Sequence, residues 1–366
     1  MKFRFNRQEL SDALGVIGHV AAPRTTKPML QCVHIKAHGD YVVLSATDLE
    51  VSVRCVATQV EVEQPGVALV GAETFGQIVR ECTDELMGVE QDGDLLHMRG
   101  AGSHFRVVTK DPAEFPPVPE MEGDADFTVD STGLHRQVEW TVYAAARENT
   151  RYAINGILWE RTAGRLTLAG TDGRRLACAT GDVKEGEGAS DAQAIVPARA
   201  MGLLARLPVD PDGQVAVKMM SNQLVLHVGR STMSTALVEG QFPKYTDVIP
   251  DDCDKHVELN TLEFQSALKR AALLTNEESK GVRLSFGEDT LTLSSRAPET
   301  GEATISMPLT YKGAPIEIGF NPTFLLDVLR VVHTDTVRFD FRDGARAAVI
   351  RLGDDFVYVV MPVNLS

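Results

Sequence analysis

The sequence has no uninterrupted apolar stretch long enough to cross a lipid bilayer, which takes about 18 residues or more. It has only five cysteines, an odd number that is scattered along the chain without a Cys-x-x-Cys pair. This spacing argues against a disulfide framework and against a zinc site, and it is typical of reduced thiols in the cytoplasm. We therefore expect a cytoplasmic protein with no membrane segment and no bound metal.

The short motifs of common catalytic and nucleotide-binding sites are also missing. The sequence contains no Walker-type phosphate loop, no GxGxxG, no HExxH and no GxSxG. The nine histidines are dispersed, and His97, His104 and His227 lie in strand-like segments, where packed or solvated side chains are the rule. We expect no catalytic residue and no cofactor.

Basic residues are outnumbered, and the formal net charge is −15. A conventional nucleic-acid-binding domain carries a basic patch on a basic domain, so this balance argues at first sight against such a partner. Net charge describes the whole surface, however, and a local field can have the opposite sign. Much of the acidic excess lies in two short segments, residues 120–126 and 251–254.

What the sequence does contain is one pattern written three times, about 125 residues apart. Each copy begins with a short alternating strand and a helix whose anchors are Leu10, Leu134 and Phe264. Further landmarks recur at similar spacing, namely Val70, Val196 and Phe320; Thr47-Asp48 and Thr171-Asp172; Phe115-Pro116 and Phe242-Pro243. A period this long exceeds that of solenoid repeats, so each unit is the size of a domain.

The pattern predicts an α+β protein of three repeated domains, residues 1–121, 122–250 and 251–366. Linkers rich in proline, glycine and acidic residues follow the Phe-Pro landmarks, at Pro117–Asp126 and Pro250–His256. Between the linkers, short strands with period-two alternation dominate. Each domain is expected to pack two helices on antiparallel sheets.

Polar caps indicate where the helices begin. Asn6 with Glu9 and Asn260 with Glu263 have the spacing of a capping box, and Asp130 occupies the same place in the middle copy. A later helix should start at Asn321-Pro322, because proline at the first helical position loses no hydrogen bond. The middle copy should carry the matching helix at residues 197–207.

One dense polar cluster, Thr171-Asp172-Gly173-Arg174-Arg175, allows two interpretations. It is either a tight turn, with Gly173 at a special dihedral angle and Asp172 bonding the local backbone, or part of an enzyme site around Asp172 and Arg175. The related Thr47-Asp48 favours the turn. An enzyme of nucleic-acid metabolism remains the alternative function, and a protein-interaction scaffold that does not act on DNA is a third.

Several segments, in order along the whole chain, closely resemble the bacterial DNA polymerase III beta subunit family, the replicative sliding clamps. They are Arg151–Gly156, Thr171–Leu176, Gly240–Tyr245, Phe320–Leu329 and Tyr358–Pro362. The resemblance implies three DNA-clamp domains per chain and a head-to-tail homodimer that closes a six-domain ring. It implies a protein that encircles double-stranded DNA without reading its sequence and has no catalytic activity of its own.

The same resemblance implies partners and a site for them. These partners are the replicative polymerase alpha subunit, clamp-loader subunits and other proteins with a clamp-binding motif, whose extended peptides insert Leu and Phe anchors into a pocket between the second and third domains. The corresponding residues are Arg151, Tyr152, Ile154, Thr171, Gly173, Arg174, Arg175, Leu176, Pro243, Val248, Asn321, Phe324, Val359, Val360, Met361 and Pro362. Arg174 stands where the family commonly has histidine, and Asp247 where it often has arginine.

Two further sets of residues follow from the resemblance. Residues expected to meet DNA, in the ring's bore or at its face, are Arg24, Arg136, Arg147, Asn149, Arg199, Arg206 and Lys269. Arg199 and Arg206, seven residues apart, are expected on one helix face, as are Arg136 and Arg147. Residues expected at the apolar dimer interface are Phe105, Val107, Leu273 and Leu274.

Overall fold

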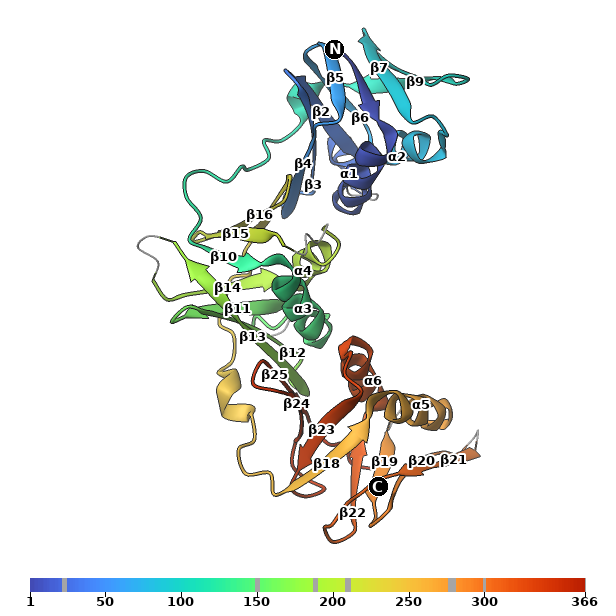
Figure 1. The fold of residues 1–366 in the computed structure, drawn as a ribbon, viewed down its shortest axis with the longest axis vertical. Coiled ribbons are helices and arrows are strands. Elements are labelled where there is room, and N and C mark those ends of the chain that lie inside the picture. The colour runs from blue at the N-terminus through green and yellow to red at the C-terminus, as the bar shows by residue number, and fades with distance from the viewer. Residues whose placement is uncertain are drawn as a thin grey trace. The chain divides into compact units, whose positions relative to one another are not determined.

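A computed structural model describes residues 1–21, 25–148, 152–186, 190–207, 212–275, 281–298 and 301–365 (Figure 1). The contacts divide the chain into two compact units. Unit 1 comprises Met1–His135, Val183–Ser190 and Arg199–Leu237, and unit 2 comprises Arg136–Asp182, Asp191–Ala198 and Val238–Ser366. Within the described ranges, no helix combines the length and apolar character needed to span a membrane.

The elements of the chain fall into three similar series. The first is β1 (Lys2–Asn6), α1 (Arg7–Val20), η1 (Pro28–Gln31), β2 (Cys32–His38), β3 (Tyr41–Thr47), β4 (Val51–Ala57), β5 (Val60–Gln64), β6 (Gly66–Gly71), α2 (Ala72–Glu81), β7 (Leu86–Asp92), β8 (Leu95–Arg99), β9 (His104–Lys110) and η2 (Pro112–Glu114). The second is β10 (Phe127–Asp130), α3 (Ser131–Thr141), η3 (Val142–Ala144), β11 (Gly156–Thr162), β12 (Arg165–Thr171), β13 (Arg175–Glu185), β14 (Ala192–Pro197), α4 (Ala198–Leu204), β15 (Gln214–Met219), β16 (Gln223–Val228), β17 (Ser231–Ala236) and η4 (Tyr245–Val248). The third is β18 (Lys255–Asn260), α5 (Thr261–Ala271), η5 (Ala272–Leu274), β19 (Val282–Phe286), β20 (Thr290–Ala297), β21 (Gly301–Pro308), β22 (Ile316–Phe320), α6 (Pro322–Val331), β23 (Thr336–Phe341), β24 (Ala348–Leu352) and β25 (Phe356–Val360).

Each unit is built on a continuous antiparallel sheet that joins strands from two series. In unit 1 the paired strands run β10–β15–β16–β17–β4–β3–β2–β6. In unit 2 they run β14–β11–β12–β13–β25–β24–β23–β18. The pair β4–β17 therefore has the same place in its unit as the pair β13–β25 has in the other. Two consecutive series are joined each time by backbone hydrogen bonds.

The predicted polar caps begin the first helix of every series. The Asn6 side chain accepts hydrogen bonds from the N–H groups of Gln8 and Glu9, at 3.0 and 3.2 Å. Asp130 accepts from Gly133 at 2.7 Å, and Asn260 from Glu263 at 3.0 Å. These side chains satisfy amides that would otherwise lack an intrahelical partner.

The capping box expected at Asn6 and Glu9 is only half formed. The Glu9 carboxylate does not return to the cap; it accepts from the backbone amides of Thr58 and Gln59, at 3.1 and 2.7 Å. It also pairs with Arg230 at 2.7 Å. These amides and this cation, distant in the sequence, compete for the carboxylate and tie α1 to the segment after β4.

Two helices are shorter than the sequence pattern predicted. The helix expected at residues 197–207 is α4, which ends at Leu204, and Pro208 disfavours helical backbone in the residue before it. Helix α3 ends at Thr141, whose hydroxyl bonds back to the carbonyl oxygen of Gln137 at 2.7 Å. By contrast, α6 begins as predicted, with the Asn321 side chain accepting from the Thr323 amide at 3.0 Å.

Helices α5 and α6 cover strands of unit 2 (Figure 1). The core there is rich in aromatic side chains, and Phe339 on β23 packs close to several of them. Its ring centroid is 5.8 Å from that of Phe320, 5.9 Å from Phe341 and 6.1 Å from Phe286. All four side chains are fully buried. Contacts among such rings add to the free energy gained from burial alone.

We predict that Phe339→Ala lowers the free energy of unfolding by about 3–5 kcal/mol, because it leaves a cavity among packed rings. Leu262→Ala, on the exposed face of α5, is the matched control and should change stability by less than about 0.5 kcal/mol. Urea unfolding of the two variants measures the difference. Equal midpoints would contradict the assignment of Phe339 to the aromatic core.

Candidate functional site

The Thr171–Arg175 cluster forms the tight turn between β12 and β13. The Thr171 hydroxyl donates to the carbonyl oxygen of Arg175 at 2.6 Å and accepts from the Gly173 amide at 3.1 Å. One Asp172 carboxylate oxygen accepts from the amides of Arg174 and Arg175, at 2.9 and 3.2 Å. Gly173 has a φ of +84°, which favours glycine. The turn accounts for the Thr, Asp and Gly of the motif.

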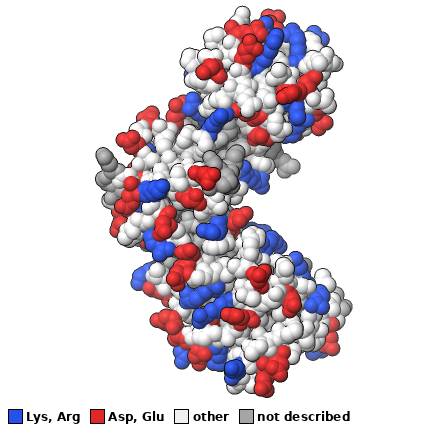
Figure 2. Space-filling view, in the orientation of Figure 1, with Lys and Arg blue, Asp and Glu red and all other residues white. Residues whose placement is uncertain are grey.

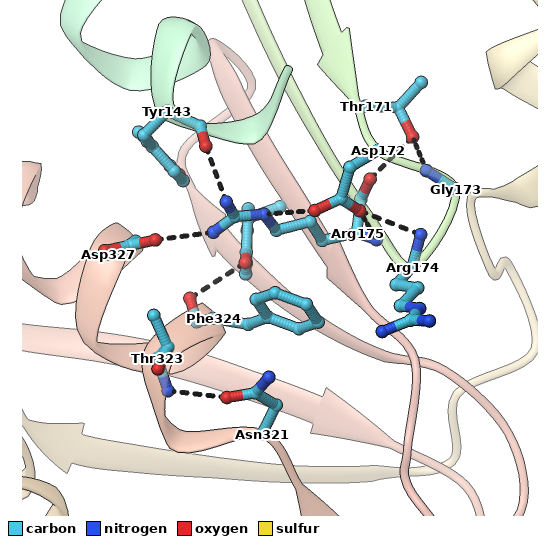
Figure 3. A network of polar contacts seen from close by, with 11 residues as sticks. Tyr143, Thr171, Asp172, Gly173, Arg174, Arg175, Asn321, Thr323, Phe324 and Asp327 are labelled. Atoms are coloured by element: carbon cyan, nitrogen blue, oxygen red, sulfur yellow. Dashed lines mark hydrogen bonds and ion pairs between the residues drawn. The ribbon is translucent and has the colours of Figure 1, made fainter. Parts of the chain in front are cut away.

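Arg175, the last residue of the motif, has a different role, because its guanidinium binds three different segments of the chain (Figure 3). Nε donates to Asp172 at 3.0 Å, Nη1 to Asp327 on α6 at 2.7 Å, and Nη2 to the Tyr143 carbonyl oxygen in η3 at 2.6 Å. The guanidinium also lies 4.6 Å from the centre of the Phe324 ring. The side chain is only 9% exposed, so a planar cation fills the space between the turn, η3 and α6.

The ionisation of this cluster is fixed by its surroundings. Burial opposes the charge on Arg175, but the hydrogen bond to Asp327 and the field of Asp172 prevail and raise the pKa of the guanidinium. Burial raises the pKa of Tyr143 and of Tyr358 well above the ordinary tyrosine value. Both phenols are neutral near pH 7, so the two carboxylates are the counterions of Arg175.

Next to this turn lies a cavity of about 250 Å³. Eleven of the residues expected in a peptide pocket line it, and all belong to unit 2: Tyr152, Ile154, Thr171, Gly173, Arg174, Arg175, Leu176, Pro243, Val248, Val359 and Met361. Much of the lining is apolar, and three of its side chains, Tyr152, Val248 and Met361, are about half exposed. An apolar cavity with exposed hydrophobic side chains suits the anchors of a bound peptide.

The other expected pocket residues lie elsewhere. Phe324 stacks under the Arg175 guanidinium, and Asn321 caps α6. Val360 is fully buried and pairs with Arg175 across β13 and β25, while Pro362 borders a separate hollow beside β22. None of these four is among the residues that line the cavity. Arg151 lies outside the described residues.

Two residues that line the cavity, Lys244 and Tyr245, were not among the pocket residues expected from the sequence. The Tyr245 hydroxyl donates to the Glu160 carboxylate at 2.7 Å, which anchors η4 against β11. Burial and that carboxylate raise the pKa of Tyr245. Lys244 pairs with Asp247 at 2.7 Å on the exposed rim. Both residues directly follow Pro243 in the repeated Phe-Pro landmark, and this closeness to an expected pocket residue could have indicated that they line the cavity.

With the geometry established, comparison with known proteins identifies the family. Models described as the N-terminal, central and C-terminal domains of the DNA polymerase III beta subunit match residues 1–119, 128–244 and 246–364. The chain belongs to the DNA polymerase III beta subunit family. It is therefore a sliding clamp of three clamp domains, a processivity factor of DNA replication.

Individual members of the family are similar to this chain over their full lengths. Beta sliding clamps of Pseudomonas aeruginosa and Escherichia coli are 33% and 32% identical, with 100% of both chains covered. Among solved structures, a sliding clamp from Pseudomonas aeruginosa has a TM-score of 0.93 at 32% identity. One from Bacillus subtilis has a TM-score of 0.92 at 25% identity, and each covers 100% of this chain and of its own.

The described residues among those expected to meet DNA are exposed cations, and they occur in both units. Arg199 pairs with Asp48, and Arg206 Nη1 lies 2.8 Å from Nδ1 of His19. In unit 2, the Arg136 guanidinium stacks 5.3 Å from the Trp140 ring centre. Figure 2 shows basic and acidic side chains intermingled on the visible face. Arg147 is exposed, Lys269 donates to Gln265 at 3.1 Å, and Arg24 and Asn149 lie outside the described residues.

The expected placing of Arg136 and Arg147 on one helix face is wrong, whereas Arg206 lies in turns that continue α4, with its N–H donating to the Leu203 carbonyl oxygen at 3.0 Å. Arg147 follows the end of α3 at Thr141. An eleven-residue spacing implies a common face only while the helix continues.

The residues expected at the dimer interface lie at exposed or half-buried positions. Phe105 and Val107 are on β9, where Phe105 is 37% exposed and Val107 is half-buried. Leu273 and Leu274 are in η5, where Leu273 is 78% exposed and Leu274 is half-buried.

We predict that Arg175→Met lowers the free energy of unfolding by about 3 kcal/mol or more, because Asp172 and Asp327 lose their shared buried counterion. Arg174→Gln, one residue earlier on the exposed side of the turn, should stay within about 0.5 kcal/mol of the wild type. Urea unfolding provides the measurement. If the two variants are equally stable, Arg175 does not hold this cluster together.

Proposed function

We propose that two copies of this sliding clamp close head to tail into a homodimeric ring around duplex DNA. The ring keeps a replicative polymerase on its template by enclosure and carries no catalytic activity. Such a protein acts in the cytoplasm, with the bacterial chromosome. The repeated strand junction carries the proposal.

Each pair of consecutive series joins through strands that occupy corresponding positions in their series. The fourth strand of the first series, β4, pairs with the last strand of the second, β17. The corresponding strand of the second series, β13, pairs with the last strand of the third, β25. In the third series that position belongs to β21, which pairs with β20 on one side and with no other described strand.

The first series offers the complementary edge. Its last strand, β9, pairs with β8 along His104–Val108, and the opposite edge of that stretch has no partner among the described strands. Joining β21 of one copy to β9 of another would repeat the junction already present in each unit. Because the joined surfaces differ, the contact is heterologous, and a suitable rotation closes it into a ring.

Apolar side chains gather beside both free edges. Val108 on β9 is 70% exposed, and Phe105 is near it on the same strand. Leu273 is 78% exposed on η5, which contacts β21. Large exposed side chains beside unpaired strand edges are typical of surfaces that another chain covers.

A ring that encloses DNA needs only weak, sequence-independent phosphate contacts, because topology provides the retention. We assign these contacts to Arg136, Arg147, Arg199, Arg206 and Lys269. Arg199 and Arg206 already contact Asp48 and His19, so each can exchange a local partner for a phosphate as the duplex moves. An acidic total charge does not oppose this arrangement.

The cavity beside the Thr171–Arg175 turn is the proposed docking site for partners. Extended peptides of the polymerase alpha subunit, of clamp-loader subunits and of other proteins with a clamp-binding motif would place Leu and Phe side chains in it. The half-exposed Met361 suits such a shared site, since methionine adapts to different partners. The alternative, an enzyme site around Asp172 and Arg175, is not favoured, because both side chains are committed to the turn and its supports.

We predict that the double substitution Leu273→Ala and Leu274→Ala shifts the protein from dimer toward monomer, because it removes apolar surface from the proposed seam. Leu262→Ala is the matched control, since this leucine is 76% exposed but lies on α5 and away from η5. Sedimentation velocity over a range of concentrations measures the change. A double variant that dissociates no more than the control would place the interface elsewhere.

A further inference from the structure

Unit 1 contains a second cavity, in the place that corresponds to the cavity beside the Thr171–Arg175 turn of unit 2. It has a volume of about 190 Å³ and lies beside the turn between β3 and β4. This turn is closed in the same way as its counterpart, because the Thr47 hydroxyl donates to the carbonyl oxygen four residues later, at 3.2 Å. The Glu50 carbonyl oxygen then accepts from the amide of Ala236, at the end of β17, at 2.9 Å. The repeated strand junction therefore also repeats the cavity.

The lining of the second cavity is polar at positions where its counterpart is apolar. Ser52 and Ser234 pair across β4 and β17, whereas Leu176 and Val359 pair at the corresponding place across β13 and β25. Ser52 donates to the Thr47 hydroxyl at 2.7 Å. Ser234 is only 3% exposed, and its hydroxyl has no hydrogen-bond partner among the described residues. A buried hydroxyl without a partner costs free energy, so a polar group of a ligand would bind favourably there.

The mouth of the second cavity carries an unpaired carboxylate. Glu50 lines the cavity and is exposed, and within the described part of the chain no cation pairs with its side chain. Arg54 on β4 pairs with Glu120 at 3.2 Å, and Arg199, which contacts the same turn, pairs with Asp48. The net charge of −15 adds to the attraction that Glu50 exerts on a cation.

Apolar side chains border this carboxylate. Leu49 lines the second cavity, is 53% exposed and has a φ of +80°. Left-handed backbone is unfavourable for leucine, and the other turn has Gly173 at this position, with a φ of +84°. Folding alone therefore favours glycine and does not explain the exposed leucine. Pro117 and Pro119, in the segment after η2, also line the cavity. Apolar surface next to an acidic group suits a long basic side chain, which has an aliphatic stem and a charged head.

We propose that the second cavity binds an arginine side chain from an extended peptide segment of a partner protein. The stem lies against Leu49 and the two prolines, and the guanidinium donates to the Glu50 carboxylate and the Ser234 hydroxyl. A guanidinium suits this site because it offers several N–H donors in a fixed plane. A volume of about 190 Å³ is smaller than most small-molecule sites, so one side chain fills it. This inference goes beyond the proposed function, since it requires neither the ring nor peptide docking in unit 2.

The test uses the full-length protein, with leucine methyl groups labelled for NMR, and the acetylated, amidated peptide Ala-Ser-Ala-Arg-Ala-Ser-Ala. A second peptide has citrulline, a neutral isostere of arginine, at its centre. The methyl signals of Leu49, identified by their loss in Leu49→Met, should shift and saturate as the arginine peptide is added. This peptide should bind roughly three- to tenfold more tightly than the citrulline peptide, as expected for an exposed but well-oriented ion pair. Added salt should narrow the difference.

Three variants identify the groups responsible. Glu50→Gln should bind both peptides equally, and it should fold because only the backbone of Glu50 takes part in the turn. Ser234→Val has at this position the side chain that Val359 supplies in unit 2, and it should remove binding of both peptides. Urea unfolding checks that both variants fold. Glu61→Gln, at an exposed site on β5 outside the cavity, makes the same change in net charge as Glu50→Gln and should keep the wild-type preference.

Three results would overturn the inference. The Leu49 signals could fail to shift with either peptide, which means that the second cavity binds neither. The wild type could bind the citrulline peptide as tightly as the arginine peptide, so that Glu50 selects no cation. Glu61→Gln could lose the preference as fully as Glu50→Gln, which means that the acidic surface as a whole attracts the peptide. Enclosure of DNA is unaffected by all three, because it is tested by the behaviour of the ring.

Discussion

Strand pairing across consecutive series is the interaction on which this structure depends. Backbone hydrogen bonds join β4 to β17 in unit 1 and β13 to β25 in unit 2, so in each unit strands of two consecutive series share one continuous sheet. The ladder fixes which residues face one another: Arg175 pairs with Val360, and the next residue, Met361, bonds to Arg174. The cavity beside the Thr171–Arg175 turn exists because this register brings the end of β25 next to the β12–β13 turn.

The buried cation Arg175 adds side-chain contacts to the segments that the strand pairing brings together. Arg175 joins the turn to η3 and α6 through two carboxylates and a carbonyl oxygen, and it covers the Phe324 ring. Its exposed neighbour, Arg174, makes no such contact in the described structure and is directed outward. Two adjacent arginines therefore have different physical roles. One holds the wall of the cavity, and the other is available to a ligand.

Much of the fold could be predicted from the sequence because its signals are local. The caps at Asn6, Asp130, Asn260 and Asn321 begin helices as expected, since an Asn or Asp side chain satisfies free amides whatever the distant packing is. Signals that depend on distant groups failed. Glu9 was expected to bond to the backbone of its own helix cap, but its carboxylate accepts from the amides of Thr58 and Gln59. These amides are about 50 residues away in the sequence, so no local pattern could indicate them.

The candidate site was harder to predict than the fold. The turn at Thr171–Arg175 could be predicted from residue types alone. The contact of Arg175 with Asp327 joins residues more than 150 positions apart, so no sequence spacing could predict it. The list of pocket residues came from family resemblance, and four of its described members do not line the cavity. Arg147 was expected on a helix that ends before it, at Thr141, because the spacing of two charged residues does not reveal where a helix ends.

The central claim is retention by enclosure, and the direct measurement compares circular with linear DNA. The protein is loaded onto a nicked circular duplex with a clamp loader and purified away from free protein, and the DNA is then cut once. A ring should remain on the circle even at elevated salt and leave the linear molecule by sliding off its ends. Equal retention on both forms, lost equally as salt is raised, would mean that the protein grips the phosphates and does not encircle the duplex.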